Sequence, residues 1–597
     1  MAGRDAFARR ARAALLPLFF SFGYVLAGEE TSPISSVEAR LKAREYQEAA
    51  AEARAVLADL DAKGAGDSMD AARLLDIVVE SAWRGNLEDG DAPSLGQRAV
   101  TLRERLTDPL DPSVAMSLHL LGNLAQARGD AAGARAFYER SLAIREKAFG
   151  LEAPEIVPSL NNLGNVTRTM GDLEASRRVL ERALAIREKT LPPTSRDLAR
   201  SHVSLGNTLS ELGALDEAER HLAKAIEILD AQQVRDFQMS TSLNTQASVL
   251  ERQGKYDEAE KALRRAIANE RENVGQTSDL AMYLGNLGVL RRDRGDLADA
   301  RALQEEALRV EEAAPATDPS WRGLLLNNLG HLFLLMGDPS GARPVLEQAL
   351  EVERRVLPAD HPQIATTLQN IGHVKLLQGD VAQACADYEQ ALGILERTVG
   401  VHHREYGEAL VDLGSARLTQ HRDAEARNLF ERALAVFQEA AGPASLASVK
   451  AGIFHADSLA ALGEHDAARK GYEEALAIVR PTFGDTHVVL AEILARLANN
   501  LAQGGHPDEA LDAALDAEAA RIRVARQALP VLPYRQALAF TAVPGGLHVA
   551  LSLAARSKDP GTTARVWDSL LQARALALDD LTRRTAPSRV SPDLEVA

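Results

Sequence analysis

The stretch that decides the fold is residues 327–350, which read NNLGHLFLLMGDPSGARPVLEQAL. It holds a Leu-Gly pair at Leu329-Gly330, a second glycine seven residues later at Gly337, then Ala342 and the pair Ala349-Leu350. Small residues let two helices approach closely, and glycine ends a helix in the left-handed conformation at little cost. The stretch therefore predicts two helices joined by a tight turn.

The same pattern recurs along most of the chain at intervals of 41 or 42 residues. Ten copies kept in phase to within one residue indicate a single structural unit repeated in tandem. The first small residue of each copy, which serves below as the reference position, is Gly122, Gly164, Gly206, Ala247, Gly288, Gly330, Gly372, Gly414, Ala456 and Ala498.

The turn between the two helices of each copy has its own signature. Glycine lies seven residues after the reference position in nine copies, and His421 replaces it in the other, so we expect that corner to be strained or differently closed. The small residue five positions further on is alanine, except for Ser176, and should complete the contact between the two helices. The aspartates that follow the glycine are expected to cap the second helix; they are Asp130, Asp172, Asp296 and Asp380.

Composition supports an all-α fold and narrows the functional class. Aromatic residues make up 4 % of the 597 residues, and the alternating β-branched and aromatic runs typical of strands are nearly absent. The net charge of −17 argues against nucleic-acid binding, which needs a basic surface. A single cysteine, Cys385, excludes a disulfide framework and a cysteine-based zinc site.

The unit resembles the tetratricopeptide repeat (TPR), whose standard length is about 34 residues. The repeat in this chain is longer than the standard one by about two helical turns, which lengthens the helices and leaves their faces in register. The Asn-Asn-Leu-Gly runs at Asn161–Gly164 and Asn327–Gly330 are similar to the kinesin-light-chain type of TPR. The resemblance covers roughly residues 108–525 and implies a right-handed superhelical solenoid of about twelve helix pairs, with weaker copies over residues 37–106.

The two ends of the chain differ from the array. Residues 1–28 join four arginines to an apolar run from Ala13 to Leu26, which predicts a secretory signal peptide and export to the periplasm or outside the cell. An uncleaved anchor or a cytosolic leader is the alternative. The run is too short for an ordinary transmembrane helix, so no stable membrane insertion is expected after processing.

Residues 528–597 lose the repeat phase but keep helical signals at Tyr534–Phe540, Leu547–Arg556 and Thr563–Arg584, before a polar tail expected to be disordered. This segment resembles the region that precedes the caspase-like CHAT domain of bacterial TPR–CHAT proteins. No catalytic residue of that domain carries over to this sequence. A helical cap on the array is the other interpretation, and the two stay open together.

The concave face of such a solenoid is lined by the first helix of each pair. Positions three before, two before and one after the reference residue should face that groove. Repeated asparagine in mid-helix is locally unfavourable, so something should compensate for it. The candidate binding residues are Asn123, Asn161, Asn162, Asn165, Asn207, Asn244, Asn286, Asn327, Asn328, His331, Asn370 and His373.

These amides have two interpretations, which the sequence does not separate. Amide donors and acceptors could hold the backbone of an extended peptide, as the resemblance to the kinesin-light-chain type implies. They could equally form a ladder of hydrogen bonds between neighbouring first helices. His331 and His373 share a column one repeat apart, but ordinary groove histidines are favoured over a metal pair. We interpret His402-His403 as loop and Cys385 as a structural thiol.

No phosphate-binding glycine-rich loop and no nucleophile elbow occurs in the sequence. The sequence therefore predicts a non-catalytic scaffold that binds a protein or peptide and needs no cofactor or metal. The alternative is a regulatory subunit of a CHAT protease supplied in trans or lost by truncation.

Overall fold

The computed structural model describes residues 33–275, 277–314, 319–528 and 546–585, and it divides into two compact units, Met1–Leu332 and Phe333–Ala597. Within the described residues, the regular secondary structure is α-helix with one short 3₁₀ turn and no strand. The all-α prediction is confirmed. The expected signal peptide at residues 1–28 and the expected helix at Tyr534–Phe540 lie outside the described residues.

The first unit contains, in chain order, α2 (Pro33–Ala43), α3 (Tyr46–Ala62), α4 (Met69–Arg84), α5 (Ala92–Leu106), α6 (Pro112–Ala127), α7 (Ala131–Phe149), η1 (Pro154–Ile156), α8 (Val157–Thr169), α9 (Leu173–Thr190), α10 (Arg196–Leu212), α11 (Leu215–Ala231), α12 (Phe237–Arg252), α13 (Tyr256–Asn273), α14 (Ser278–Asp293), α15 (Leu297–Ala313) and α16 (Pro319–Leu335), whose last turn belongs to the second unit. The second unit contains α17 (Pro339–Val356), α18 (Pro362–Leu377), α19 (Val381–Thr398), α20 (Arg404–Thr419), α21 (Asp423–Ala441), α22 (Leu446–Ala461), α23 (His465–Phe483), α24 (Val488–Gln503), α25 (Pro507–Ala528), α27 (Leu547–Arg556) and α28 (Pro560–Thr585).

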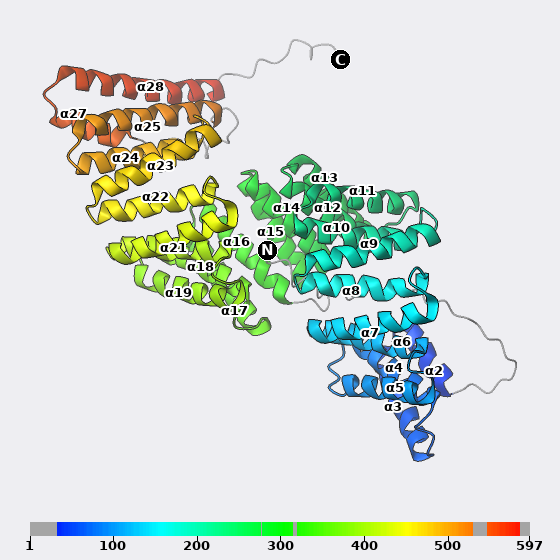
Figure 1. Cartoon of the computed structure of the whole chain (residues 1–597). Coiled ribbons are helices and arrows are strands. Elements are labelled where there is room, and N and C mark those ends of the chain that lie inside the picture. Colours follow the sequence, from blue (N-terminus) through cyan, green and yellow to red (C-terminus); the bar gives the residue numbers. More distant parts are fainter. Residues whose placement is uncertain (1–32, 276, 315–318, 529–545, 586–597) are drawn as a thin grey trace, which may run out of the picture. The chain divides into compact units, whose positions relative to one another are not determined.

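Consecutive helices pack against each other in chain order within each unit (Figure 1). From α6 to α25, the even-numbered helix is the first of a repeat, called helix A, and the odd-numbered helix is the second, called helix B. Each unit is therefore a solenoid of tandem helix pairs. The weaker copies upstream are helix pairs as well, α2 with α3 and α4 with α5.

The reference glycine of helix A is small because a side chain of helix B lies directly beneath it. A β-carbon on Gly122 would lie 2.5 Å from the ring of Tyr138, and one on Gly372 would lie 2.6 Å from the ring of Tyr388. The alanine five residues past the turn is 0 % exposed in every repeat that carries it. Ser176, which replaces it once, is also buried and donates its hydroxyl to the Gly164 carbonyl at 2.8 Å.

Every predicted turn glycine has a positive φ, between +74° at Gly337 and +87° at Gly379. His421 takes the same left-handed conformation, with φ +57°, so its corner closes like the others despite the side chain. Backbone of this kind is unfavourable for a residue with a β-carbon, and the strain expected at that corner is present.

The predicted aspartate caps are right in part. Asp130 accepts from the Gly133 amide at 2.8 Å and Asp172 accepts from the Ala175 amide at 3.2 Å. The prediction is wrong for Asp296 and Asp380, which make no capping hydrogen bond. Asp296 instead pairs with Arg291 at 2.8 Å, because a cation four residues before the turn competes for its carboxylate.

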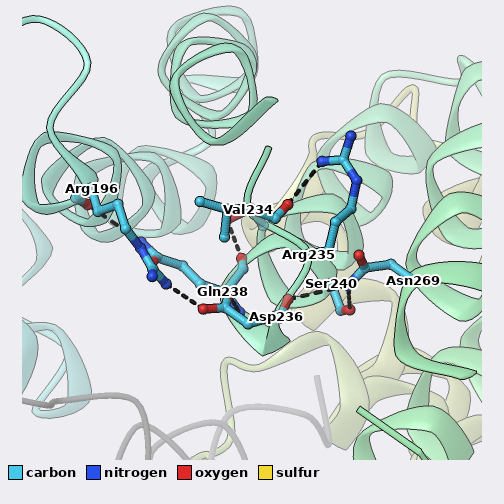
Figure 2. Close-up of polar contacts among 8 residues, drawn as sticks. Arg196, Val234, Arg235, Asp236, Gln238, Ser240 and Asn269 are labelled. Atoms are coloured by element: carbon cyan, nitrogen blue, oxygen red, sulfur yellow. Dashed lines mark hydrogen bonds and ion pairs between the residues drawn. The ribbon is translucent and has the colours of Figure 1, made fainter. Parts of the chain in front are cut away.

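Polar contacts also fix the start of a helix A against the end of its helix B. In Figure 2 the Asn269 amide, from the end of α13, donates to the Asp236 carbonyl at 3.1 Å and to the Ser240 hydroxyl at 2.7 Å. The Asp236 carboxylate caps α12 by accepting from the backbone N–H of Gln238 at 3.0 Å, and it also binds Arg196 of the preceding repeat. One short segment therefore joins α10, α12 and α13.

The C-terminal helices α27 and α28 continue the packing, and both contact α25. α27 has the predicted bounds, and α28 extends the predicted helix to Pro560–Thr585. This packing is what a cap on the last repeat requires. The resemblance to a region preceding a CHAT domain stays a prediction.

Candidate functional site

The candidate binding residues lie on the A helices, but they differ in how much of their surface is exposed. Half of the twelve are buried, with 5–9 % of their surface exposed: Asn123, Asn161, Asn162, Asn244, Asn327 and Asn370. The other half are half-buried: Asn165, Asn207, Asn286, Asn328, His331 and His373. The first group has too little exposed surface to hold a ligand alone, so the second group forms the accessible part of the site.

Several of these amides connect one A helix to the next. The Asn162 amide donates to Asn123 Oδ1 at 2.9 Å, and the Asn286 amide donates to Asn244 Oδ1 at 2.8 Å. Each bond joins residues about one repeat apart, from the position two before the reference glycine to the previous helix A. Hydrogen bonds between neighbouring A helices, one of the two interpretations of the asparagines, are therefore present at these two places.

Helix B contributes to the same ladder. The Tyr138 hydroxyl donates to Asn123 Oδ1 at 2.8 Å, so that oxygen accepts two hydrogen bonds. Asn161 Oδ1, when its amide faces Arg187, accepts from that guanidinium at 2.9 and 3.2 Å. These bonds satisfy polar groups that would otherwise be buried without partners, which offsets the poor helix propensity of asparagine.

In the second unit the ladder includes charged residues as well as an amide. His373 Nε2 lies 3.0 Å from Asp412 Oδ1, and the Gln369 amide donates to Asp412 Oδ2 at 2.7 Å. Burial by itself would lower the pKa of His373, but the hydrogen bond and the charge of Asp412 outweigh it and raise that pKa. Between α22 and α24, Arg496 pairs with Asp457, which also accepts from the Tyr472 hydroxyl at 2.6 Å.

The sequence interpretation missed Tyr138, Tyr472 and Arg496 as members of this ladder. The two tyrosines could have been found from the sequence, because both lie sixteen residues after a reference position. Arg496 occupies the position two before Ala498, where other repeats carry asparagine. Its guanidinium also lies over the Phe454 ring, 5.6 Å from the ring centre. The candidate set of asparagines and histidines therefore left out Arg496 and the two tyrosines.

Three accessible amides, one of them Asn328 on α16, keep unused hydrogen-bonding groups. The other two, Asn165 on α8 and Asn207 on α10, are half-buried, and neither side chain makes a hydrogen bond within the described residues. Both occupy the position one after the reference glycine, in adjacent repeats. Their amides therefore form the best candidate contact points on the A helices of the first unit.

The residues considered for other chemistry have structural surroundings. His331 is engaged in a contact of its own and His373 binds Asp412, while no group of three or more His, Cys, Asp or Glu able to hold a metal occurs among the described residues. Cys385 is buried, which raises the pKa of its thiol and keeps it protonated. His402 and His403 lie in a loop as predicted, and His403 caps α20.

A hollow in the first unit does not coincide with these residues. It has a volume of about 420 Å³ and lies at the ends of α7 and α9, between Glu146, Leu151, Arg182 and Lys189. Its charged groups are already paired, Arg182 with Glu146 and Lys189 with Glu152. It is a gap between B helices and leaves the A-helix amides as the candidate site. Among the described helices, none has both the length and the apolar character needed to cross a membrane.

Comparisons with known proteins agree with this architecture. A family model described as tetratricopeptide repeat matches residues 155–231, 238–313, 321–384, 363–439 and 451–523, and a second model with that description matches residues 114–155. Together these matches cover more than half of the chain. None of the curated proteins compared with the chain matches it.

Among solved structures, one similar chain holds the nearly identical TPR-like repeats of a Podosopora anserina protein described as a kinesin light chain. It shares 20 % identity over 35 % of this chain and 99 % of its own, with a TM-score of 0.32. Another is BtubC (BKLC) from P. vanneervenii, with 20 % identity over 38 % of this chain and 89 % of its own, and a TM-score of 0.33.

Proposed function

Because this chain belongs to the tetratricopeptide-repeat family, whose members generally serve as non-catalytic scaffolds for protein–protein interaction, we propose that it binds an extended peptide segment of a partner protein. The peptide lies along the A helices of the first unit. The observation that carries the proposal is the pair of accessible amides without partners, Asn165 and Asn207.

The spacing of these amides suits a peptide backbone. Neighbouring helices pack with their axes roughly 8–10 Å apart, and an extended chain advances about 3.3 Å per residue. Amides on adjacent A helices therefore meet peptide groups about three residues apart. An asparagine side chain both donates and accepts, so each amide can bind a backbone C=O or N–H group of the ligand.

The surroundings of these two amides favour backbone contacts over side-chain selection. Val203 and Ser204, on the same face of α10, are half-buried and uncharged. In the second unit, by contrast, the position two before the reference residue is Asp412 on α20 and Arg496 on α24, and the position one after it on α22 is Asp457. These residues bind one another or neighbouring side chains. The first unit therefore binds the backbone of the peptide without selecting for its side chains.

The test begins with peptides selected from a random display library on the full chain. The affinity of each selected peptide is then measured by fluorescence polarisation for three proteins: the wild type, the double variant N165A/N207A, and the control variant N428A. Asn428 lies exposed on helix B of another repeat, so its removal tests for a general effect of losing an amide. Circular dichroism establishes that all three proteins fold alike.

We expect the double variant to bind at least about tenfold more weakly, since two hydrogen bonds worth roughly 1 kcal/mol each are lost. N428A should bind as the wild type does. Equal affinity for the wild type and N165A/N207A would place the binding site elsewhere on the chain, and a selection that enriches no peptide would oppose a peptide-binding function.

We also propose that the protein is exported, on the basis of residues 1–28 alone. Mass spectrometry of the mature N-terminus from the native host tests this proposal. A mature chain that begins shortly after Gly28 supports it, and a retained residue 1 opposes it.

A further inference from the structure

One repeat of the first unit holds two histidines in direct contact. His202 lies on α10 and His221 lies on α11, with their Nδ1 atoms 2.9 Å apart. Their ring centres are 5.2 Å apart. With the two Nδ1 atoms only 2.9 Å apart, the ring centres can be this far from each other only when the two Nδ1 atoms lie on the line between them, that is, when the rings meet head-on. His202 is buried, with 6 % of its surface exposed, and His221 is half-buried.

The same place in the other repeats is filled by apolar side chains or by glycine, apart from Asp387 in one repeat. His202 lies four residues before its reference glycine, where leucine occurs in eight of the other nine repeats and Gly452 in the ninth. His221 lies fifteen residues after that glycine, where Phe137 and Leu303 are typical occupants. An apolar contact between helices A and B is thus replaced, in one repeat only, by a polar contact between two titratable groups.

The head-on geometry is that of a hydrogen bond. When both imidazoles are neutral, one Nδ1–H donates to the lone pair of the other Nδ1. A metal ion would need the two lone pairs to converge on a common point, which the head-on arrangement does not provide. A single added proton leaves one N–H···N bond in place. A second added proton turns both Nδ1 atoms into donors and sets two positive charges against each other.

The charged groups around the pair come from α9 and α11. Burial, together with the charges of His221 and Lys224, lowers the pKa of His202 to about 4. Burial also lowers the pKa of His221, assisted by Arg220, while Glu188, Glu217 and Glu181 act in the opposite direction. The folded pair therefore binds protons less readily than two exposed histidines, and acid favours the state in which the contact is broken.

We propose that His202 and His221 form an acid-sensitive latch: the hydrogen-bonded pair holds α10 against α11, and protonation of both rings releases this contact. The latch acts on one repeat, because the other described repeats have no histidine pair at this place. α10 also carries Asn207, so acid would weaken peptide binding as well; this consequence alone rests on the proposed function.

Hydrogen exchange of the full chain, read by mass spectrometry and corrected for the intrinsic effect of pH, tests the latch without any peptide. For His202, a pKa of 6.5 when exposed and about 4 when folded gives roughly thirtyfold more opening of the α10–α11 hairpin at pH 5 than at pH 8. The α14–α15 hairpin, which carries Leu284 and Leu303 at the same place, serves as the internal reference.

Two variants complete the test. H202L/H221L restores an apolar contact and should remove the excess opening of α10–α11 in acid, and H221Q should reduce it by removing one titratable group. If the double variant does not fold, H221Q decides. Excess opening that persists unchanged in the variants, or that is absent from the wild type, would overturn the proposal. Since exchange does not involve a peptide, this result is independent of the test of peptide binding.

Discussion

Replacing Glu353 by glutamine should stabilise the second unit at alkaline pH and leave its stability at acidic pH nearly unchanged. Glu353 lies in the last turn of α17 and is 0 % exposed. Its Oε1 accepts from the Gln363 amide at 2.9 Å and from the Thr367 hydroxyl at 3.0 Å. Its Oε2 has no hydrogen-bond partner among the described residues.

The magnitude follows from the shift in protonation. Burial raises the pKa of Glu353 from 4.5 to about 7, against the opposing effects of Gln363, Thr367 and His361. Below pH 4.5 this carboxyl group is protonated in both the folded and the unfolded protein, and the folded state carries no penalty from it. As the pH rises from 4.5 to about 7, the unfolded protein ionises first, and the free energy of unfolding falls. A shift of this size corresponds to about 3 kcal/mol. A glutamine stays neutral throughout and keeps the oxygen that accepts both hydrogen bonds.

Urea denaturation of the full chain, followed by circular dichroism at pH 5 and pH 8, measures the effect. We expect E353Q to exceed the wild type by about 3 kcal/mol at pH 8 and to differ by less than about 1 kcal/mol at pH 5. The matched control is E351Q, on the same helix, because the Glu351 side chain is 71 % exposed and pairs with Arg355. Equal differences between E353Q and the wild type at both pH values would refute the reasoning, since the buried carboxylate would then carry no pH-dependent penalty.

Three further changes test the packing rules. G372A should lower the free energy of unfolding by about 1–3 kcal/mol, because its β-carbon would overlap the Tyr388 ring, and an unchanged urea midpoint would contradict this contact. H421G should raise the melting temperature by relieving about 1 kcal/mol of left-handed strain, whereas a lower value would show that the side chain stabilises the corner. N162A should cost about 1 kcal/mol, and the N123A background should reduce that cost in a double-mutant cycle if the two amides are coupled.

Much of the fold could be predicted because its signals are local. A glycine that must take a positive φ, or an alanine that must lie against another helix, leaves a mark at a fixed position in every copy. The turn at Gly337 and the buried Ala342 were therefore predicted from residues 327–350 alone, and the phase of the copies gave the order of the helix pairs. The capping role of Asp296 failed because a nearby arginine competes for its carboxylate, and sequence spacing does not reveal that competition.

The candidate site could be predicted only in part, because the exposure of its residues depends on tertiary packing. The sequence by itself determined that the chain is an array of helix pairs, and which column of each helix A carries the amides. Only the tertiary structure decided that Asn123 and Asn162 bind each other while Asn165 and Asn207 keep unused amides, because exposure depends on how the next repeat packs. The contact between His202 and His221 was likewise invisible in the sequence, since their nitrogens meet only after two helices fold back on each other.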